Sequence, residues 1–191
     1  MTCHEILVES PVGTLRLLAE DDALIGLYME KHAREIVHAA VRDGRGHPVL
    51  TAASEQLGAW FAGDRTRFDM PLRPRGTPFQ LAVWVALTEI PFGQTRTYGE
   101  IAARLGRPSA ARAVGAANGR NPISIVVPCH RVIGSSGALT GYAGGVERKR
   151  WLLEHERAVL ARGTDRRGTG VALRDDLAAP APRMRSQETD R

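Results

Sequence analysis

Short apolar runs separated by turn residues occupy the first third of the chain. Three such runs lie at residues 6–8, 15–18 and 24–28, with turn signals at residues 11–13 and 21–22 between them. Runs of this length bounded by Gly, Pro and Asp are typical of strands joined by tight turns. The pattern therefore predicts a small antiparallel sheet.

Two segments after these runs have helical character. Residues 33–42 form one candidate helix. Residues 49–61 form a second, in which Leu57 and Trp60 lie near helical spacing. We expect Gly63 to end the second helix, since glycine is common just past a helix C-terminus.

A change of composition divides the chain. Residues 70–76 contain two prolines and one glycine, which neither a helix interior nor a central strand tolerates. We therefore expect an N-terminal domain at residues 1–69, a linker at 70–76 and a second domain at 77–160. Residues 161–191 have mixed charge with many Arg, Gly and Pro, which predicts a disordered tail.

The second domain opens with helical signals. Thr-Pro-Phe-Gln at residues 77–80 has the pattern of a capping box and predicts a helix over 78–89. In that helix Phe79, Val83 and Trp84 lie on one stripe, which we interpret as core.

Two shorter helices follow and resemble a helix-turn-helix. We expect one at residues 98–105 and another that Ser109 caps and that ends near residue 118. The second is built almost entirely of small residues and projects one long cation, Arg112. Such a helix suits a narrow groove with one inserted side chain, and an alanine-rich helix packed on another helix is the alternative.

Charge is distributed unevenly along the chain. The 191 residues carry 26 Lys and Arg against 21 Asp and Glu, a net charge of +5. Residues 1–76 have 9 basic and 11 acidic side chains, residues 77–158 have 10 and 5, and residues 159–191 have 7 and 5. The basic middle segment indicates a polyanionic partner such as nucleic acid. General overuse of arginine is the alternative interpretation.

The chain shows no signal for a membrane or for secretion. No apolar run approaches the roughly 20 residues that span a bilayer, so we expect no membrane partner. The first residues lack a basic segment followed by an apolar one, and two cysteines cannot build a disulfide framework. We therefore expect a cytoplasmic protein with free thiols.

A cysteine next to a histidine is the main candidate for chemistry. Residues 123–127 form an apolar run that predicts a buried strand ending at Pro128, and Cys129 and His130 follow at once. Basic neighbours and a strand end are a setting that lowers the pKa of a thiol. An inert core cysteine is the alternative. Adjacent side chains on an extended chain diverge, so His130 can serve Cys129 only if the backbone turns there.

A long loop and a helix complete the candidate site. Residues 134–145 form a glycine-rich loop of a length that is usually functional, and a helix is expected over 146–160. Leu152, Glu156 and Val159 lie on one stripe of that helix. An inward glutamate needs a partner, and a catalytic histidine is one candidate.

These motifs resemble the O6-alkylguanine-DNA alkyltransferase family, densely over residues 77–158. The residues that carry the resemblance are Tyr98, Ala111-Arg112-Ala113-Val114-Gly115, Asn121-Pro122, Pro128-Cys129-His130-Arg131-Val132, Gly141-Tyr142-Ala143-Gly144-Gly145, Trp151-Leu152-Leu153 and Glu156. The resemblance implies a mixed α/β (α+β) fold, with a ribonuclease H-like N-terminal domain and a winged helix-turn-helix-like C-terminal domain.

The resemblance also implies a set of catalytic residues. Cys129 would be the nucleophile and alkyl acceptor. His130 would deprotonate it through a water molecule, with Glu156 orienting His130, and Asn121 would brace the turn.

A second set would contact substrate and DNA. Tyr98 would hydrogen-bond N3 of the flipped guanine, Arg112 would fill the vacated stack, and Tyr142 would cover the alkyl pocket. Backbone carbonyls near Cys129 and Val132 would accept from the exocyclic amine of guanine, and the main-chain N–H of Ala143 would make a further contact. Ser109, Ala111 and Gly115 complete the predicted DNA contact.

The implied activity is DNA repair by irreversible, single-turnover alkyl transfer. The substrate would be O6-alkylguanine, and also O4-alkylthymine, flipped from duplex DNA on the minor-groove side. We expect no cofactor and a monomer, and cooperative binding on DNA stays open.

Other interpretations remain open. A non-catalytic lesion sensor of the alkyltransferase-like type usually has tryptophan where Cys129 stands. A transcription factor with a four-cysteine zinc domain and a cysteine hydrolase are further alternatives. Cys3 and His4 could begin a metal site, but other ligands are not evident, so we expect no metal.

Overall fold

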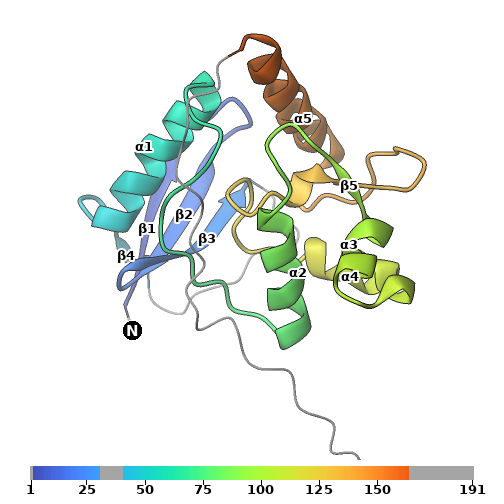
Figure 1. Cartoon of the computed structure of the whole chain (residues 1–191). Coiled ribbons are helices and arrows are strands. Elements are labelled where there is room, and N and C mark those ends of the chain that lie inside the picture. The colour runs from blue at the N-terminus through green and yellow to red at the C-terminus, as the bar shows by residue number, and fades with distance from the viewer. Residues whose placement is uncertain (1, 31–40, 164–191) are drawn as a thin grey trace, which may run out of the picture.

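The computed structural model describes residues 2–30 and 41–163, and the part so described begins with a four-stranded sheet. Strands β1 (Cys3–Val8), β2 (Leu15–Glu20) and β3 (Ala23–Met29) pair antiparallel in sequence order, which confirms the predicted small antiparallel sheet. A short strand β4 (Val41–Asp43), which we did not predict, adds parallel to β1. Figure 1 shows the sheet beside one long helix, with the remaining helices on the other side.

The helix expected over 33–42 ends in a segment that is a strand. Residues 33–40 lie outside the described residues, but Val41 and Arg42 belong to β4, so the prediction is wrong at its end. Val41 and Arg42 pair with Cys3 and His4 of β1, and this long-range ladder overrides local helical spacing.

Helix α1 (Pro48–Ala62) confirms the second predicted helix. It ends at Gly63, whose left-handed φ of 82° lets its N–H bond the carbonyl of Trp60 at 3.0 Å. Leu57 and Trp60 are fully buried. This helix covers one face of the sheet, and its end lies near α5 (Val146–Ala161), the predicted last helix.

Helix α2 (Pro78–Thr88) begins with the predicted capping box. Thr77 N–H donates to Oε1 of Gln80 at 2.8 Å, and Gln80 N–H donates to Oγ1 of Thr77 at 3.3 Å. Val83 and Trp84 are buried, as expected of the core stripe. Trp84 also donates from Nε1 to the carbonyl of Ala117 at 3.0 Å, which ties the following helices to α2.

The predicted helix pair is present with a different junction. Helix α3 (Tyr98–Arg104) is followed by a 3-10 helix, η1 (Pro108–Ala110), and then by α4 (Ala111–Asn118). Ser109 is therefore not an N-cap, and this prediction is wrong. Pro108 fixes a helical φ one residue earlier, and the N–H of Ala110 bonds back to Arg107, so Ser109 lies inside a turn.

Residues 123–127 are buried but do not form the predicted strand. One isolated bridge joins Ile123 to Leu27 of β3, and the chain then turns, with φ of 68° at Ile125. The N–H of Val127 donates to the carbonyl of Ile123 at 3.0 Å, which closes a turn. After the N–H of Ser124, which still donates to Leu27 of β3, the backbone N–H groups of Val126 and Val127 donate within the turn, so the ladder is not extended.

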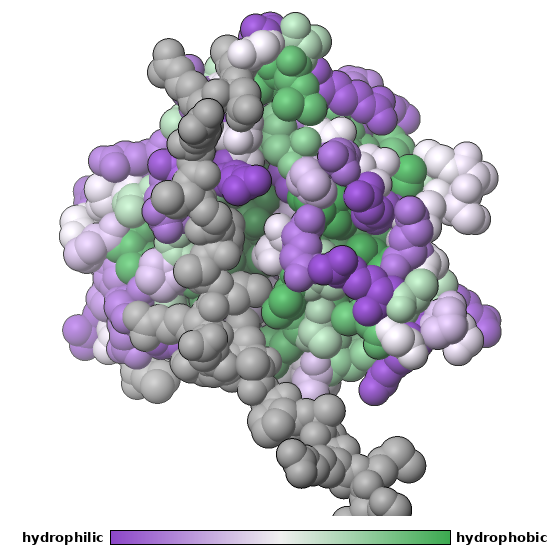
Figure 2. Space-filling model, in the orientation of Figure 1, coloured by the Kyte–Doolittle hydropathy of each residue, from purple (hydrophilic) through white to green (hydrophobic). Residues whose placement is uncertain are grey.

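One hydrophobic core joins both halves of the described structure. It includes Leu27 and Trp60 from the first half and Val83, Ile123 and Leu152 from the second. The residues of the expected linker also pack on the sheet, since Leu24 N–H donates to the carbonyl of Pro71 at 2.9 Å. Figure 2 shows one face of the molecule, on which hydrophilic residues lie at the left and the right and hydrophobic residues lie between them.

The division into two domains stays a prediction. Residues 164–191, most of the predicted tail, lie outside the described residues. Within the part that is described, no helix is long and apolar enough to cross a membrane.

Candidate functional site

A tight turn carries the cysteine and histidine. Cys129, His130 and Arg131 form one 3-10 turn, η2 (Cys129–Arg131), which is entered through Pro128 with ψ of 62°. The N–H of Cys129 donates to the carbonyl of Val127 at 2.8 Å, and all three side chains of the turn are buried. The backbone thus makes the turn that His130 needs in order to serve Cys129.

Two asparagine side chains hold this turn. Asn121 donates from Nδ2 to the carbonyl of Val127 at 2.8 Å and accepts from the N–H of Ile123 at 3.0 Å. Asn118 donates from Nδ2 to the carbonyl of Cys129 at 3.3 Å. Asn121 was expected at this turn but Asn118 was not, since its only signal in the sequence is a polar side chain at the end of a helix of small residues.

The thiol of Cys129 has a raised pKa, and the predicted lowering is wrong. Burial raises its pKa, because a charged thiolate loses hydration in the interior. Three neighbours oppose this effect, namely a side-chain hydrogen bond from Asn121, the charge of Lys149 and the nearby Tyr142 hydroxyl. The site therefore keeps a neutral thiol at rest but holds groups that stabilise a thiolate.

Lys149 and two tyrosines surround the thiol. Lys149 is fully buried and donates from Nζ to the carbonyl of Thr140 at 2.9 Å, and the Tyr98 hydroxyl reaches the same carbonyl at 3.4 Å. Burial raises the pKa of both Tyr98 and Tyr142, and the negative charge of a Cys129 thiolate adds to each rise. Lys149 was not predicted, although it lies three residues before Leu152 on the inward stripe of α5.

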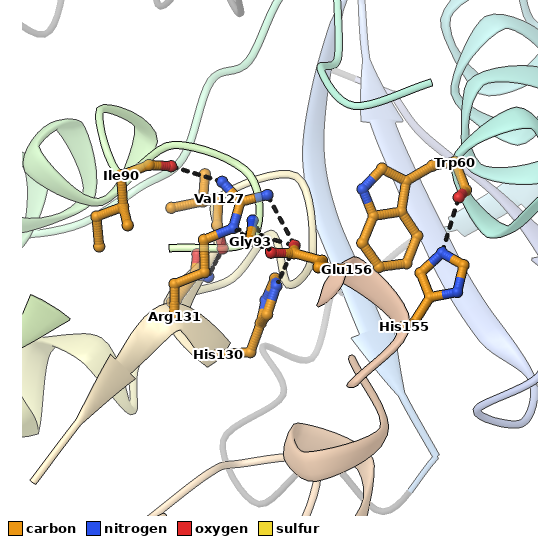
Figure 3. A network of polar contacts seen from close by, with 9 residues as sticks. Trp60, Ile90, Gly93, Val127, His130, Arg131, His155 and Glu156 are labelled. Atoms are coloured by element: carbon orange, nitrogen blue, oxygen red, sulfur yellow. Dashed lines mark hydrogen bonds and ion pairs between the residues drawn. The ribbon is translucent and has the colours of Figure 1, made fainter. Parts of the chain in front are cut away.

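His130 and Glu156 form a buried pair. Nε2 of His130 lies 2.8 Å from Oε1 of Glu156, and neither side chain is exposed (Figure 3). Burial, with the charges of Arg131 and Lys149, lowers the pKa of His130, although Glu156 opposes this. His130 is thus neutral near pH 7, and its buried Nδ1 has no hydrogen-bond partner among the described residues. A neutral imidazole with one ring nitrogen available can act as a base.

Glu156 is ionised although it is buried. Burial alone would raise its pKa, but His130 and Arg131 lower the pKa of Glu156 to about 2. Arg131 donates to the carboxylate from Nε and Nη2, and the N–H of Gly93 donates to Oε2 at 2.7 Å. Sequence reasoning found the inward Glu156 but missed Arg131 and Gly93, which meet it only in the folded chain.

The other predicted substrate- and DNA-contact residues range from exposed to buried. Arg112 on α4 and Ser109 on η1 are exposed, and Ala111 is partly exposed. A Cβ at Gly115 would lie 3.7 Å from the ring of Tyr98, so this helix approaches the tyrosine closely. Val132 is buried in β6 (Val132–Ile133), which pairs with β5 (Arg96–Thr97), and Ala143 is partly buried in the glycine-rich loop.

The candidate metal ligands do not form a cluster. Cys3 is buried in the sheet, where it packs with Leu18 and Ile25. In the described ranges, no group of three or more His, Cys, Asp or Glu side chains is arranged to hold a metal ion.

Comparisons with known proteins agree over almost the whole described chain. Residues 78–158 match a family model described as 6-O-methylguanine DNA methyltransferase, DNA binding domain, and residues 3–74 match the ribonuclease-like domain of the same family. The methylated-DNA–protein-cysteine methyltransferase of Mycobacterium bovis is 51% identical over 81% of this chain and 93% of the relative. That of Methanosarcina acetivorans is 49% identical over 78% and 96%. The crystal structure of Mycobacterium tuberculosis OGT in complex with DNA superposes with a TM-score of 0.77 at 50% identity, over 82% of this chain and 94% of that one.

Proposed function

The chain belongs to the 6-O-methylguanine DNA methyltransferase family, a family of enzymes, and from that premise we propose that Cys129 accepts the alkyl group of O6-alkylguanine in duplex DNA. The observation that carries the proposal is the buried Cys129 thiol, which is set among thiolate-stabilising groups and is followed in the same turn by His130, the partner of Glu156. A non-catalytic sensor of the alkyltransferase-like type usually has tryptophan at this position, so the cysteine favours transfer.

The proposed reaction is a single displacement. Nδ1 of His130 takes the thiol proton through a water molecule, and the negative Glu156 stabilises the imidazolium that forms. The thiolate then attacks the alkyl carbon, a C–S bond forms, and the C–O6 bond breaks with its electron pair going to guanine. The Tyr98 hydroxyl donates its proton to N3 of the guanine as the C–O6 bond breaks, so that guanine is released as a neutral base, and the tyrosinate regains a proton from the His130 imidazolium through water.

The proposed DNA contact uses α4. Its small side chains allow a close approach to the minor groove, and the exposed Arg112 fills the stack that the flipped nucleotide leaves. Ser109, Ala111 and Gly115 lie along the same surface. Flipping costs a few kcal/mol, and the cost is least for a damaged pair, which favours O6-alkylguanine and O4-alkylthymine.

Stoichiometry tests the proposed function. Incubation with excess duplex containing O6-methylguanine should add the mass of one methylene group to the Cys129 peptide, because nothing in the site can break a thioether. Each molecule should repair one lesion. An unmodified Cys129 after repair, or many lesions repaired per molecule, would contradict the proposal.

Replacing the exposed arginine of α4 should weaken binding to duplex DNA without slowing alkyl transfer from a free base. We expect Arg112→Ala to weaken binding to lesion-containing duplex roughly tenfold or more, the effect of losing a contact worth about 1–3 kcal/mol. Reaction with the free base O6-benzylguanine should change little. Arg45→Ala removes another exposed cation, in the segment that follows β4, and is the matched control. Equal losses on duplex and free base would exclude the role of Arg112 in flipping.

A further inference from the structure

Arg131 makes the most extensive contacts of any residue around Glu156. Its Nε lies 3.0 and 3.1 Å from the two carboxylate oxygens, and Nη2 donates to Oε1 at 2.8 Å. A planar guanidinium can grip a carboxylate at two points, whereas an ammonium cannot. Arg131 thus fixes the plane of the Glu156 carboxylate as well as its charge.

The guanidinium is itself anchored from behind. Nη1 donates to the carbonyl of Ile90 at 2.6 Å, and the group lies 5.6 Å from the centre of the Phe92 ring. The N–H of Gly93, in the same loop, donates to Oε2 of Glu156. Figure 3 shows Arg131 and Glu156 bridging this loop to His130. Among the residues that the structure describes, the donors to the carboxylate are Arg131, Gly93 and His130, which leave it little freedom to rotate away.

From this geometry we propose that Arg131 is a positioning residue for the alkyl transfer. It holds Glu156 ionised and oriented on Nε2 of His130, and so directs Nδ1 of His130 toward the thiol proton. The inference rests on the proposed function of Cys129, because it assigns Arg131 a part in activating that thiol.

The charges around His130 determine how the loss of Arg131 would change the pKa values of His130 and Glu156. The pKa of His130 is shifted by the charges of Glu156, Arg131 and Lys149. The pKa of Glu156 is shifted by His130 and Arg131. Arg131 lowers the pKa of both partners. Without its charge, the pKa values of Glu156 and His130 both rise, and the pair takes up a proton at a higher pH. His130 is then less available as a base in mildly acidic solution.

The pH dependence of single-turnover transfer tests this role. Rates are measured on saturating O6-methylguanine duplex, for the full chain and for Arg131→Met, Arg131→Lys and the control Arg73→Met. We expect the acidic limb of the pH–rate profile to lie about one pH unit or more higher in Arg131→Met than in the parent. Arg131→Lys keeps the positive charge but loses the bidentate hydrogen bonds to Glu156. The acidic limb of its pH–rate profile should therefore stay near that of the parent, while its plateau rate falls about tenfold. Arg73 pairs with Asp21 and Asp22, away from this site, and Arg73→Met should leave both unchanged.

The possible outcomes distinguish a positioning role of Arg131 from a purely structural one, and both from a failure of the proposed function. A merely structural arginine would change the unfolding midpoint but leave the limb and the rate per folded molecule unaltered, which overturns the inference. If Arg131→Met does not fold, Arg131→Lys decides, because an unchanged plateau rate would overturn it as well. If the parent and Arg73→Met also fail to alkylate Cys129, the proposed function itself is wrong.

Discussion

Alkyl transfer should fall to background in Cys129→Ala, while binding of lesion-containing duplex persists. The sulfur is the only proposed acceptor, so its removal leaves no route to a stable product. The turn should survive, because Asn118 bonds the main-chain carbonyl of residue 129 and Asn121 bonds that of Val127. Transfer of a labelled methyl group and fluorescence anisotropy on the same duplex measure the two properties.

The other cysteine offers a matched control. Cys3 is buried as fully as Cys129, and burial likewise raises the pKa of its thiol. The charges of Glu20 and Glu5 raise this pKa further, and those of Arg16 and Arg75 lower it. Cys3→Ala should therefore retain full transfer. Activity in Cys129→Ala, or its loss in Cys3→Ala, would exclude Cys129 as the sole acceptor.

The two thiols differ in their neighbours rather than in their burial. Both thiols are neutral at rest because both are buried. Around Cys129, however, Asn121, Lys149 and Tyr142 stabilise a thiolate. A buried thiol with such neighbours forms its anion only when a base takes the proton, which suits a reagent that is used once. This is why the direction of the pKa shift alone does not identify a reactive cysteine.

Local signals predicted most of the elements. The capping box at Thr77 and Gln80 and the glycine after α1 act within one turn of the backbone, so they can be recognised in the sequence. The apolar run at residues 123–127 shows the limit of such signals. Its burial was predictable, but the turn depends on contacts with Asn121 and Leu27 that no local pattern encodes.

The site was predictable where a motif or a helical stripe marked it. Glu156 followed from its place beside Leu152 and Val159. Arg131 did not, because its role depends on Ile90, which lies 41 residues away in the sequence. The raised pKa of Cys129 was missed for a related reason, since burial is a property of the folded chain.

Glu156→Gln should reduce both stability and transfer. The pKa of Glu156 is about 2 in the folded protein, against 4.5 for an unperturbed glutamate. Because the folded pKa is depressed, the stabilisation is complete above pH 4.5 and is lost as the pH falls toward 2. The difference corresponds to about 3 kcal/mol at pH 7. We expect Glu156→Gln to lose a free energy of unfolding of this order in denaturant titrations at pH 7, and to lose less of its remaining stability below pH 4.5. Glu154→Gln, an exposed change on the same helix, is the control.

A double variant distinguishes the two roles of this carboxylate. In Glu156→Gln the charge of Arg131 stays buried without its partner, which is the costly state of a broken ion pair. Adding Arg131→Met removes that charge, so the double variant should regain part of the lost stability. It should not regain transfer, because His130 still lacks a carboxylate to stabilise its protonated form. Parallel recovery of stability and transfer would mean that Glu156 serves only to hold the fold together.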